Sequence, residues 1–249
     1  MFSGQLLGGK RQAASWHIAD EVPLVMFYNS VQFGVMMLTP AEFEDFAIGF
    51  SLTEGIVASH LEISDIRLET IGDGMAVNII VPEAALKVAQ NRKRTISGGS
   101  SCGICGAQTL ETALPKPPMT CGFIPDPETA LLALHGLPAK QTINQVSHST
   151  QAAAFADKQG KIVLIREDVG RHNSLDKLCG AMALGGLTPQ DGFLVLSSRF
   201  SVELAQKAAS IGFSFVACVS APTTLALKIA KQAKMDVATL SDAQIMWFD

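Results

Sequence analysis

The residue pattern with the clearest chemistry is a pair of cysteines, Cys102 and Cys105, in the segment Ser97–Gly106, SGGSSCGICG. A C-x-x-C spacing supports three chemistries: half of a zinc site, a redox dithiol, or one activated thiolate with a second thiol close by. Glycine on both sides of the pair predicts a loop, which differs from the strand-to-helix setting of a thioredoxin-like dithiol. A thiolate that visits a donor and then a buried acceptor gains from such a tether. The pattern therefore favours Cys102 and Cys105 as the catalytic residues of a carrier.

Two zinc-binding alternatives compete with this interpretation. A structural zinc site lacks a second cysteine pair, since Cys121 stands alone and His135 would have to be recruited from a distance. The segment His60–Glu62 followed by the C-x-x-C resembles the H-x-E and P-C-x-x-C pattern of zinc deaminases, but Ser101 stands where the proline belongs. We expect no metal in the site, and a zinc-dependent deaminase is the least favoured alternative.

A basic run at residues 92–94, RKR, precedes the cysteine segment. Its positive charges could stabilise a thiolate or dock a donor protein. A solvated charge run with no specific role is an equally good interpretation of the same three residues.

Polar residues also gather in the three loops that follow predicted strands, Arg166–Asn173, Ser197–Ser201 and Ser220–Thr224. Because parallel strands end at one edge of a sheet, these loops should meet there. Each loop leads into a helix N-terminus, which favours anions. We therefore predict a site for a phosphate-bearing ligand. Its candidate residues are Arg166, Arg171, His172, Asn173, Ser198, Arg199, Ser220 and Thr223.

Part of this polarity has a structural explanation. Hydroxyl groups at helix starts usually cap the helix, which is the favoured interpretation for Thr223 on its own. Glu167 and Asp168 are expected to form internal ion pairs with Arg166 or Arg171.

The N-terminal third is predicted to combine strands with one well-marked helix. Thr39 is the expected cap of this helix, with Pro40 in the first turn and Glu42 completing a capping box. Apolar residues at helical spacing then indicate a buried face. That face is Phe43, Phe46, Ala47 and Phe50, and Gly55 is the expected stop. The neighbouring elements are strands Val31–Leu38 and Met75–Val81 and a helix Pro82–Gln90.

The C-terminal part alternates strands with helices, which predicts an α/β fold with a mixed, mostly parallel sheet covered by helices. The expected domains are a smaller α+β subdomain at 1–91, a flexible Gly/Ser/Pro-rich segment with the cysteines at 92–127, and an α/β core at 128–249. The predicted elements of the core are strands Ile162–Ile165, Phe193–Leu196, Phe215–Val219 and Val237–Leu240 and helices Ser174–Leu184, Val202–Ile211 and Thr223–Lys234.

Composition sets the broad class of the protein. A chain of 249 residues with 48% hydrophobic residues can bury the core of one large domain or two modest ones. A net charge of −4 gives no general attraction to nucleic acid. Scattered cysteines suit a reducing compartment, and the apolar surroundings of Cys179 and Cys218 predict buried, structural roles. Without an apolar leader or a membrane span, we expect a cytoplasmic protein that binds neither nucleic acid nor membranes.

Together these segments resemble the FdhD family of formate dehydrogenase accessory sulfurtransferases, from about Glu21 to about Ala230. The most specific part of the resemblance is the presence of SCGxCG and REDVGRHN in this order. The matching stretches are Glu21–Leu24, Thr39-Pro40, Ala47–Ile56, Ser101–Gly106, Arg166–Lys177, Glu203 with Lys207-Ala208, and Ser220–Thr223.

The resemblance implies an activity. Members take sulfur from a cysteine desulfurase as a persulfide and pass it to molybdenum bis(molybdopterin guanine dinucleotide), before this cofactor enters formate dehydrogenase. They have a core similar to the cytidine deaminase fold, act as homodimers and bind guanine nucleotide, which would be a surrogate ligand here. By position, Cys102 would carry the persulfide and Cys105 would be its partner.

Two stretches depart from the family pattern. Gln151 stands where the family's T-G-x-x-H-A-A segment would have its histidine, with His148 nearby. The last residues, LSDAQIMWFD, have none of the arginine or glycine of a cofactor-binding stretch, and we place the expected contact at Leu240, Ser241 and Asp242. A second hypothesis is a non-catalytic chaperone that delivers the molybdenum cofactor while its cysteines do nothing essential, and the atypical C-terminus argues against it, because cofactor binding should be strongest there.

Overall fold

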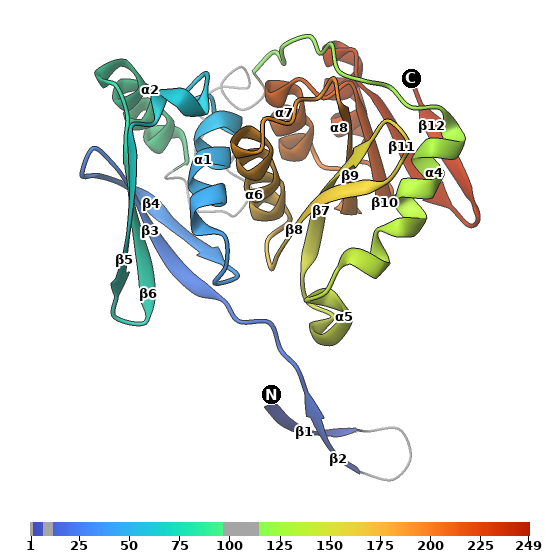
Figure 1. Ribbon diagram of the computed structural model, residues 1–249, viewed down its shortest axis with the longest axis horizontal. Coiled ribbons are helices and arrows are strands. Elements are labelled where there is room, and N and C mark those ends of the chain that lie inside the picture. Colours follow the sequence, from blue (N-terminus) through green and yellow to red (C-terminus); the bar gives the residue numbers. More distant parts are fainter. Residues whose placement is uncertain (1, 7–11, 97–114) are drawn as a thin grey trace.

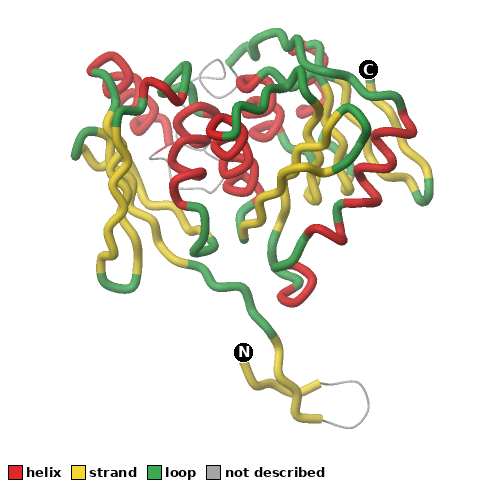
Figure 2. The backbone as a smooth tube through the Cα atoms, in the orientation of Figure 1, coloured by secondary structure: helices red, strands yellow, loops and turns green. Residues whose placement is uncertain are grey.

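The computed structural model describes residues 2–6, 12–96 and 115–249. The predicted cysteine loop, with Cys102 and Cys105, lies outside the described residues. Within these ranges, no helix is long and apolar enough to cross a membrane. The chain forms a four-stranded and a six-stranded sheet with helices between them (Figure 1, Figure 2).

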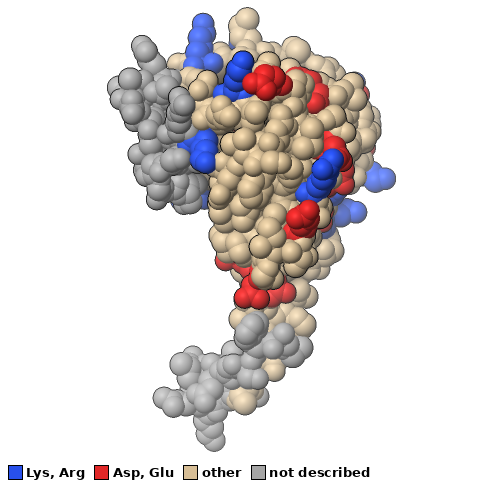
Figure 3. Space-filling view, turned by 90° about the vertical axis from the view of Figure 1, so that its left-hand side faces the viewer, with Lys and Arg blue, Asp and Glu red and all other residues tan. Residues whose placement is uncertain are grey.

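The four-stranded sheet has the strand order β4-β3-β6-β5 and stands at the left of Figure 1. Alternate residues of β3, namely Leu24, Met26 and Tyr28, point into a core shared with α1 and α2. The opposite face leaves Val35 and Met37 exposed and carries few charged side chains at its centre (Figure 3). The elements are β3 (Val22–Tyr28), β4 (Val31–Leu38), α1 (Phe43–Thr53), β5 (Asp65–Ile71), β6 (Gly74–Ile80) and α2 (Glu83–Ile96).

The six-stranded sheet has the order β12-β11-β10-β9-β7-β8. Helices α6, α7 and α8 cover one face and α4 covers the other, so each face has its own apolar core (Figure 1). The strands are β7 (Gln151–Asp157), β8 (Ile162–Asp168), β9 (Gly192–Arg199), β10 (Phe215–Ser220), β11 (Asp236–Ser241) and β12 (Gln244–Phe248). The helices are α4 (Pro127–Gly136), α6 (Arg171–Leu184), α7 (Val202–Ile211) and α8 (Thr224–Ala233).

The α/β class and the mixed sheet are confirmed. The expected majority of parallel strands is found in the direction in which the strands run, but not in their hydrogen-bonded pairs, most of which are antiparallel. β10 pairs parallel with β9 and β11. β7 lies between β8 and β9 and pairs antiparallel with both, and β12 pairs antiparallel with β11. Consequently β8, β9, β10 and β11 run in one direction. Their carboxyl ends share one edge of the sheet, and β7 begins at that same edge.

Two glycines allow α1 and α6 to pack closely between the sheets. A Cβ on Gly49 would lie 1.7 Å from the carbonyl oxygen of Asp176, and a Cβ on Gly180 would lie 1.9 Å from that of Asp45. Only glycine permits backbones to approach this closely. The contact between α1 and α6 therefore joins the N-terminal and C-terminal halves of the described chain.

The predicted start of the first helix is wrong. α1 begins at Phe43, and its N-cap Glu42 has a φ of 49° and no side-chain capping bond. The Thr39 hydroxyl instead accepts a hydrogen bond from Val169 N at 3.1 Å, and Thr39 N donates to Asp168 Oδ2 at 3.0 Å. Thr39, which was predicted to cap the helix, therefore forms a contact between distant segments of the chain instead. The predicted apolar stripe is confirmed, since Phe46, Ala47 and Phe50 are buried.

The remaining elements are short. The hairpin of β1 and β2 extends away from the two sheets at the N-terminal end (Figure 1). The segment around His60 is a turn of 3-10 helix with a complete capping box from Ser59. These elements are β1 (Phe2–Leu6), β2 (Gln12–Trp16), η1 (His60–Glu62), η2 (Pro138–Lys140) and α5 (Asn144–Ser147). The domain limits at 91 and 127 stay predictions.

Candidate functional site

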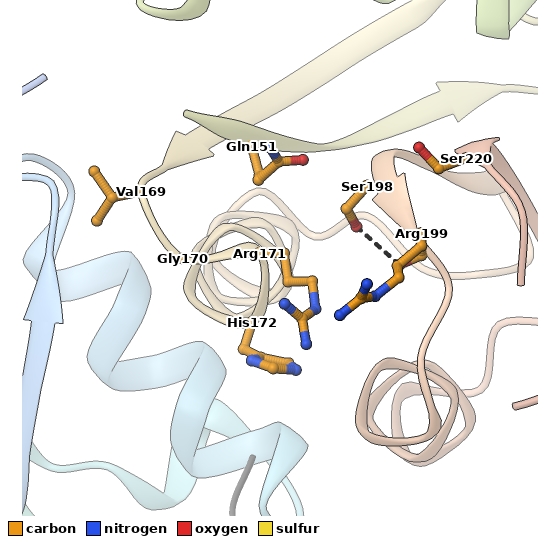
Figure 4. A pocket seen from close by; sticks show the side chains of 8 residues that line it. All are labelled: Gln151, Val169, Gly170, Arg171, His172, Ser198, Arg199 and Ser220. Atoms are coloured by element: carbon orange, nitrogen blue, oxygen red, sulfur yellow. Dashed lines mark hydrogen bonds between the residues drawn. The ribbon is translucent and has the colours of Figure 1, made fainter. Parts of the chain in front are cut away.

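A cavity of about 720 Å³ opens at the edge of the larger sheet where β8, β9 and β10 end and β7 begins (Figure 4). Each of the three loops that were predicted to meet contributes to its wall. The lining residues are Gln151, Val169, Gly170, Arg171, His172, Ser198, Arg199 and Ser220. The structure therefore brings together five predicted site residues, Arg171, His172, Ser198, Arg199 and Ser220, whose ligand binding stays a prediction.

Arg171 and His172 occupy the first turn of α6, directly after the N-cap Gly170. A Cβ on Gly170 would lie 2.6 Å from Asn173 Nδ2, so a larger residue here would displace the Asn173 side chain. The free N–H groups of this turn adjoin the cavity and favour an anion. Arg171 Nε and His172 Nε2 are buried without a hydrogen-bond partner. Buried nitrogens without partners at a cavity wall fit a ligand that brings its own acceptors.

Arg199 ends β9, and its guanidinium points toward that of Arg171 (Figure 4). Ser198 Oγ donates to the Arg199 carbonyl at 3.1 Å, and Ser220 pairs with Arg199 across the two strands after a bulge. In the described part of the chain, no ion pair joins Arg171 or Arg199 to a carboxylate. The cavity therefore carries two uncompensated positive charges, which an anionic ligand would neutralise.

Gln151 lines the cavity although it is absent from the predicted binding residues. It begins β7, and its Oε1 accepts a hydrogen bond from Ser197 Oγ at 3.2 Å. Ser197 Oγ in turn accepts from Ala152 N at 2.8 Å. The signal available in the sequence was the departure at this position, where the family pattern has histidine. Val169 and Gly170 were also missed, because they contribute backbone and shape to the wall.

Two predicted site residues, Arg166 and Asn173, bond elsewhere in the protein and do not line the cavity. Arg166 Nε forms an ion pair with Asp45 Oδ2 of α1 at 2.7 Å. Asn173 Nδ2 donates to the Met37 carbonyl and to Asp168 Oδ1, both at 2.8 Å. Both residues therefore tie the larger sheet to the N-terminal half, which is a structural role.

The expected pairing of Glu167 and Asp168 with the arginines of their own loop is wrong. Glu167 accepts hydrogen bonds from Ile143 N at 2.9 Å and Asn144 N at 2.8 Å. Asp168 forms a fully buried ion pair with Lys177 at 2.8 Å. Because both carboxylates are engaged in this way, Arg171 is left without a partner among them.

The other predicted site residues lie outside the cavity wall. Thr223 caps α8 by accepting from Ala226 N at 3.3 Å, which agrees with its structural interpretation. Leu240 and Ser241 end β11, and Asp242 follows with a φ of 56°. Their turn lies at the same edge of the sheet, one strand beyond β10. A ligand contact at these three residues stays a prediction.

A buried ionic cluster lies between α1, α6 and α7. Lys207 Nζ bonds to Thr53 Oγ1 at 2.9 Å, to both oxygens of Asp176 at 2.9 and 3.0 Å, and to Glu54 Oε1 at 2.8 Å. Burial alone would lower the pKa of Lys207, but the two carboxylates raise it. Burial dominates at Asp176 and raises its pKa. At Glu54 burial is outweighed by Lys207 and Arg92, and the pKa is lowered.

The structure confirms the predicted burial of Cys179 and Cys218. Cys179 and Cys218 are buried, and burial raises the pKa of the Cys218 thiol to about 12. A thiol that stays protonated is a poor nucleophile. Cys121 is exposed. Within the described ranges, no group of three or more His, Cys, Asp or Glu residues could hold a metal ion.

The basic run that precedes the cysteine segment makes contacts within the chain. Arg92 Nε lies 3.1 Å from Glu54 Oε2. Lys93 Nζ donates to the Gln32 carbonyl at 2.7 Å. Both contacts hold the end of α2 against the rest of the N-terminal half, and a role toward a thiolate stays a prediction.

Fold and cavity together define an α/β protein with an arginine-lined cavity at the carboxyl edge of a mixed sheet. The chain belongs to the FdhD/NarQ family, which matches residues 19–246. It is 41% identical over 231 residues to the sulfur carrier protein FdhD of Bordetella bronchiseptica, covering 92% of this chain and 84% of that protein. It is also 41% identical over 227 residues to the sulfur carrier protein FdhD of Xanthomonas euvesicatoria, covering 91% and 81%.

The fold is also similar to a solved structure. The crystal structure of a candidate formate dehydrogenase accessory protein from Desulfotalea psychrophila aligns with a TM-score of 0.74 and 20% identity, covering 100% of this chain and 95% of that chain. This similarity concerns the fold alone. The family model and the relatives at 41% identity confirm the family resemblance inferred from the sequence motifs.

Proposed function

We propose that this protein is a sulfur carrier, a sulfurtransferase that accepts persulfide sulfur from a cysteine desulfurase and passes it to molybdenum bis(molybdopterin guanine dinucleotide). The acceptor then serves formate dehydrogenase. Relatives that are 41% identical bear the name sulfur carrier protein, which supports the proposal. The observation that carries it is the cavity with the unpaired guanidinium groups of Arg171 and Arg199.

The cavity is chemically suited to the proposed acceptor. Each guanine dinucleotide of that acceptor contains a diphosphate, and guanidinium groups bind phosphate oxygens in a bidentate manner. The N-terminal turn of α6 adds backbone N–H donors. A volume of about 720 Å³ lies within the range of roughly 300–1,000 Å³ for small-molecule sites. We infer that Arg171 and Arg199 hold phosphate, with Ser198 and Ser220 as hydroxyl partners, and that guanine nucleotide is a usable surrogate.

The proposed loading step is a thiol–persulfide exchange. The Cys102 thiolate attacks the outer sulfur of the donor persulfide, a new S–S bond forms on Cys102, and the donor cysteine leaves as its thiolate. No net oxidation occurs, because one sulfur–sulfur bond replaces another. Cys105 supplies the second thiol of the pair. In the transfer step the Cys105 thiolate attacks the Cys102 sulfur, a Cys102–Cys105 disulfide forms as the persulfide S–S bond breaks, and the outer sulfur leaves as hydrosulfide for the acceptor that the cavity holds by its phosphates.

The proposal includes partners and a compartment. A cysteine desulfurase supplies the sulfur, and the catalytic subunit of formate dehydrogenase receives the finished cofactor. We expect a homodimer in the cytoplasm, without nucleic acid or membrane partners. A reducing compartment suits this chemistry, because the carrier thiols must be free to accept sulfur.

A second candidate function is a non-catalytic chaperone for the same cofactor. It rests on the positive charges of Arg171 and Arg199 in the described part of the cavity wall, which would hold the same cofactor whether or not the cysteines react. Under this alternative, a variant with both Cys102→Ala and Cys105→Ala would still activate formate dehydrogenase in cells. Under the sulfur-carrier proposal, the same variant would leave formate dehydrogenase inactive.

The experiment that tests the sulfur-carrier proposal is intact-mass spectrometry after incubation with a cysteine desulfurase and cysteine. The wild-type protein is expected to gain sulfur atoms that a reductant removes. Cys102→Ala should lose the gain, whereas Cys121→Ala, which removes an exposed cysteine outside the pair, should keep it. No gain in the wild type beside a desulfurase of proven activity would contradict the proposal and favour the chaperone.

A further inference from the structure

The side chain of Gln151 is held in one orientation by a short chain of hydrogen bonds. Ala152 N donates to Ser197 Oγ at 2.8 Å, and Ser197 Oγ donates to Gln151 Oε1 at 3.2 Å. A serine hydroxyl has a single hydrogen, so Ser197 donates to one acceptor. If the carboxamide of Gln151 turned over, this partly buried hydroxyl would lose the acceptor that it has in the structure. The hydrogen bonds therefore fix which end of the amide is the oxygen and which is the nitrogen.

The nitrogen of the same amide is available to a ligand. Gln151 lines the cavity, whereas Ser197, which binds the amide oxygen, does not. Within the described residues, Gln151 Nε2 has no hydrogen-bond partner, and it is not among the fully buried polar atoms that lack one. The nitrogen is therefore accessible at the cavity wall. Because the oxygen already accepts from Ser197, the amide offers a ligand its two N–H donors first.

Gln151 occupies a different part of the wall from the two guanidinium groups. Figure 4 shows Arg171 and Arg199 pointing toward each other, while Gln151 lies apart from both at the start of β7. The cavity of about 720 Å³ has the size of sites that hold a whole drug-sized molecule, which is larger than a diphosphate. The arginines suit the phosphates of such a ligand. The neutral amide of Gln151 is then left for the uncharged part of the ligand.

We propose that Gln151 is a specificity-determining residue that donates from Nε2 to a carbonyl oxygen on the uncharged part of a phosphate-bearing ligand. Ser197 is its positioning residue. The inference rests on the proposed function, in which the uncharged part includes guanine, whose O6 is such an oxygen. Adenine has an amino group, which is a donor, at the corresponding position. An amide that presents a donor therefore favours guanine over adenine.

The selection depends on Ser197 because an unrestrained carboxamide can bind either base. After turning over, Gln151 would accept from the amino group of adenine through Oε1, just as it donates to guanine through Nε2. The hydrogen bond from Ser197 opposes this turn. A site whose hydrogen-bonding groups are fixed rejects an analogue that presents the wrong group, because polar atoms are then left unpaired.

The test compares the affinities of GDP, inosine diphosphate, ADP and inorganic pyrophosphate by calorimetry. The wild type should bind GDP more tightly than ADP. Gln151→Met keeps a side chain of similar length without the amide, and should lower the ratio of GDP to ADP affinity roughly tenfold, the effect of one hydrogen bond. Inosine diphosphate shares O6 with GDP and lacks its amino group, so it should lose affinity as GDP does. Pyrophosphate affinity should not change.

The same substitution at a surface position is the matched control. Gln159→Met lies in an exposed turn and should match the wild type for all four ligands. Gln151→Glu has the shape of the native side chain and offers acceptors in place of donors. Its negative charge weakens GDP and ADP alike and cancels in their ratio. That ratio should therefore fall below the ratio of Gln151→Met.

Ser197→Ala separates a positioning role from a structural one. It releases the amide of Gln151 and should lower the ratio of GDP to ADP affinity part of the way. In the Gln151→Met background the same substitution should change the ratio no further. A structural role of Ser197 would instead weaken all ligands by the same factor. Thermal unfolding checks that each variant is folded.

The outcomes are distinct. A GDP preference that falls in Gln151→Met and in Ser197→Ala, with pyrophosphate affinity unchanged, would support the inference. Equal affinity of the wild type for GDP and ADP, or an unchanged ratio in folded Gln151→Met, would overturn the inference and leave the proposed function standing. Absence of GDP and pyrophosphate binding to the wild type would overturn both the anion site and the inference.

Discussion

Two charge-rich regions to which α6 contributes, the buried cluster around Lys207 and the cavity wall, are built in opposite ways. In the buried cluster, Lys207 is surrounded by the oxygens of Asp176, Glu54 and Thr53 at 2.8 to 3.0 Å. At the cavity, Arg171 and Arg199 have no carboxylate partner within the described residues. The first region is complete within the chain, whereas the second lacks the negative charge that would complete it.

The presence or absence of an ion-pair partner distinguishes structural from functional arginines within the motif REDVGRHN, residues 166–173. Arg166 and Arg171 are five positions apart in that motif, yet Arg166 is paired with Asp45 and Arg171 is unpaired. A charge that folding has already neutralised contributes to stability. A charge left unpaired in a cavity has a desolvation cost that only a ligand can offset. The residues without partners are therefore the ones that mark the site.

The largest effect on stability is expected from a substitution that breaks the buried ionic cluster around Lys207. Lys207→Met leaves Asp176 buried without its cation and Glu54 with Arg92 alone, and should lower the free energy of unfolding by about 3–5 kcal/mol. Lys228→Met, on the exposed side of α8, is the matched control and should stay within about 0.5 kcal/mol. Denaturant unfolding followed by circular dichroism measures both. A Lys207→Met protein as stable as the wild type would contradict the structural role of the cluster.

A smaller and more selective effect is expected from the two arginines of the motif. Arg166→Gln removes the partner of the mostly buried Asp45 and should cost about 1–3 kcal/mol of stability, with GDP affinity unchanged. Arg171→Gln should do the reverse and weaken GDP binding without loss of stability. Thermal unfolding and calorimetry on both variants check this crossed pattern. If both variants lost the same property, the distinction between paired and unpaired arginines would be wrong.

Much of the fold could be predicted because local signals agree with tertiary packing. The helix Val202–Ile211 and the strand Val31–Leu38 have the predicted bounds. Residues 151–157, QAAAFAD, were not predicted as a strand. This strand, β7, lies between β9 and β8 and is buried on both faces, so its alanines show no alternation of apolar and polar residues. The start of α1 was misplaced because the Thr39 side chain bonds to residue 169, which no local pattern reveals.

The site could be predicted only in part, for a related reason. The strand-to-helix loops indicated the edge of the sheet and five of the residues at the cavity. Which cations would stay unpaired could not be predicted, because the partners come from distant segments. Arg166 and Asp45, for example, are 121 residues apart. Gln151 escaped prediction because it begins a strand that was not itself predicted.

The smallest effect is expected on the unfolding free energy at acidic pH, through Glu203. The pKa of Glu203 is lowered from its ordinary value of 4.5 to about 2 in the folded protein, because burial, which raises it, is outweighed by polar contacts with His172 and at the start of α7. Its contribution to stability is therefore fully present above 4.5 and is lost as pH falls toward 2. In Glu203→Gln this contribution is absent, so its unfolding free energy should change less over that interval than that of the wild type. Urea unfolding at a series of acidic pH values measures the difference, and identical pH profiles would contradict it.

The measurement that tests the central claim most directly is GDP binding by calorimetry with the wild type and Arg171→Gln/Arg199→Gln. Losing two charge-assisted contacts should weaken binding by about 100-fold or more, with the thermal unfolding midpoint unchanged. Arg67→Gln, which removes an exposed cation on β5, is the control and should bind like the wild type. Equal GDP affinity in the wild type and the double variant would show that the arginine-lined cavity is not the site of the acceptor's phosphates.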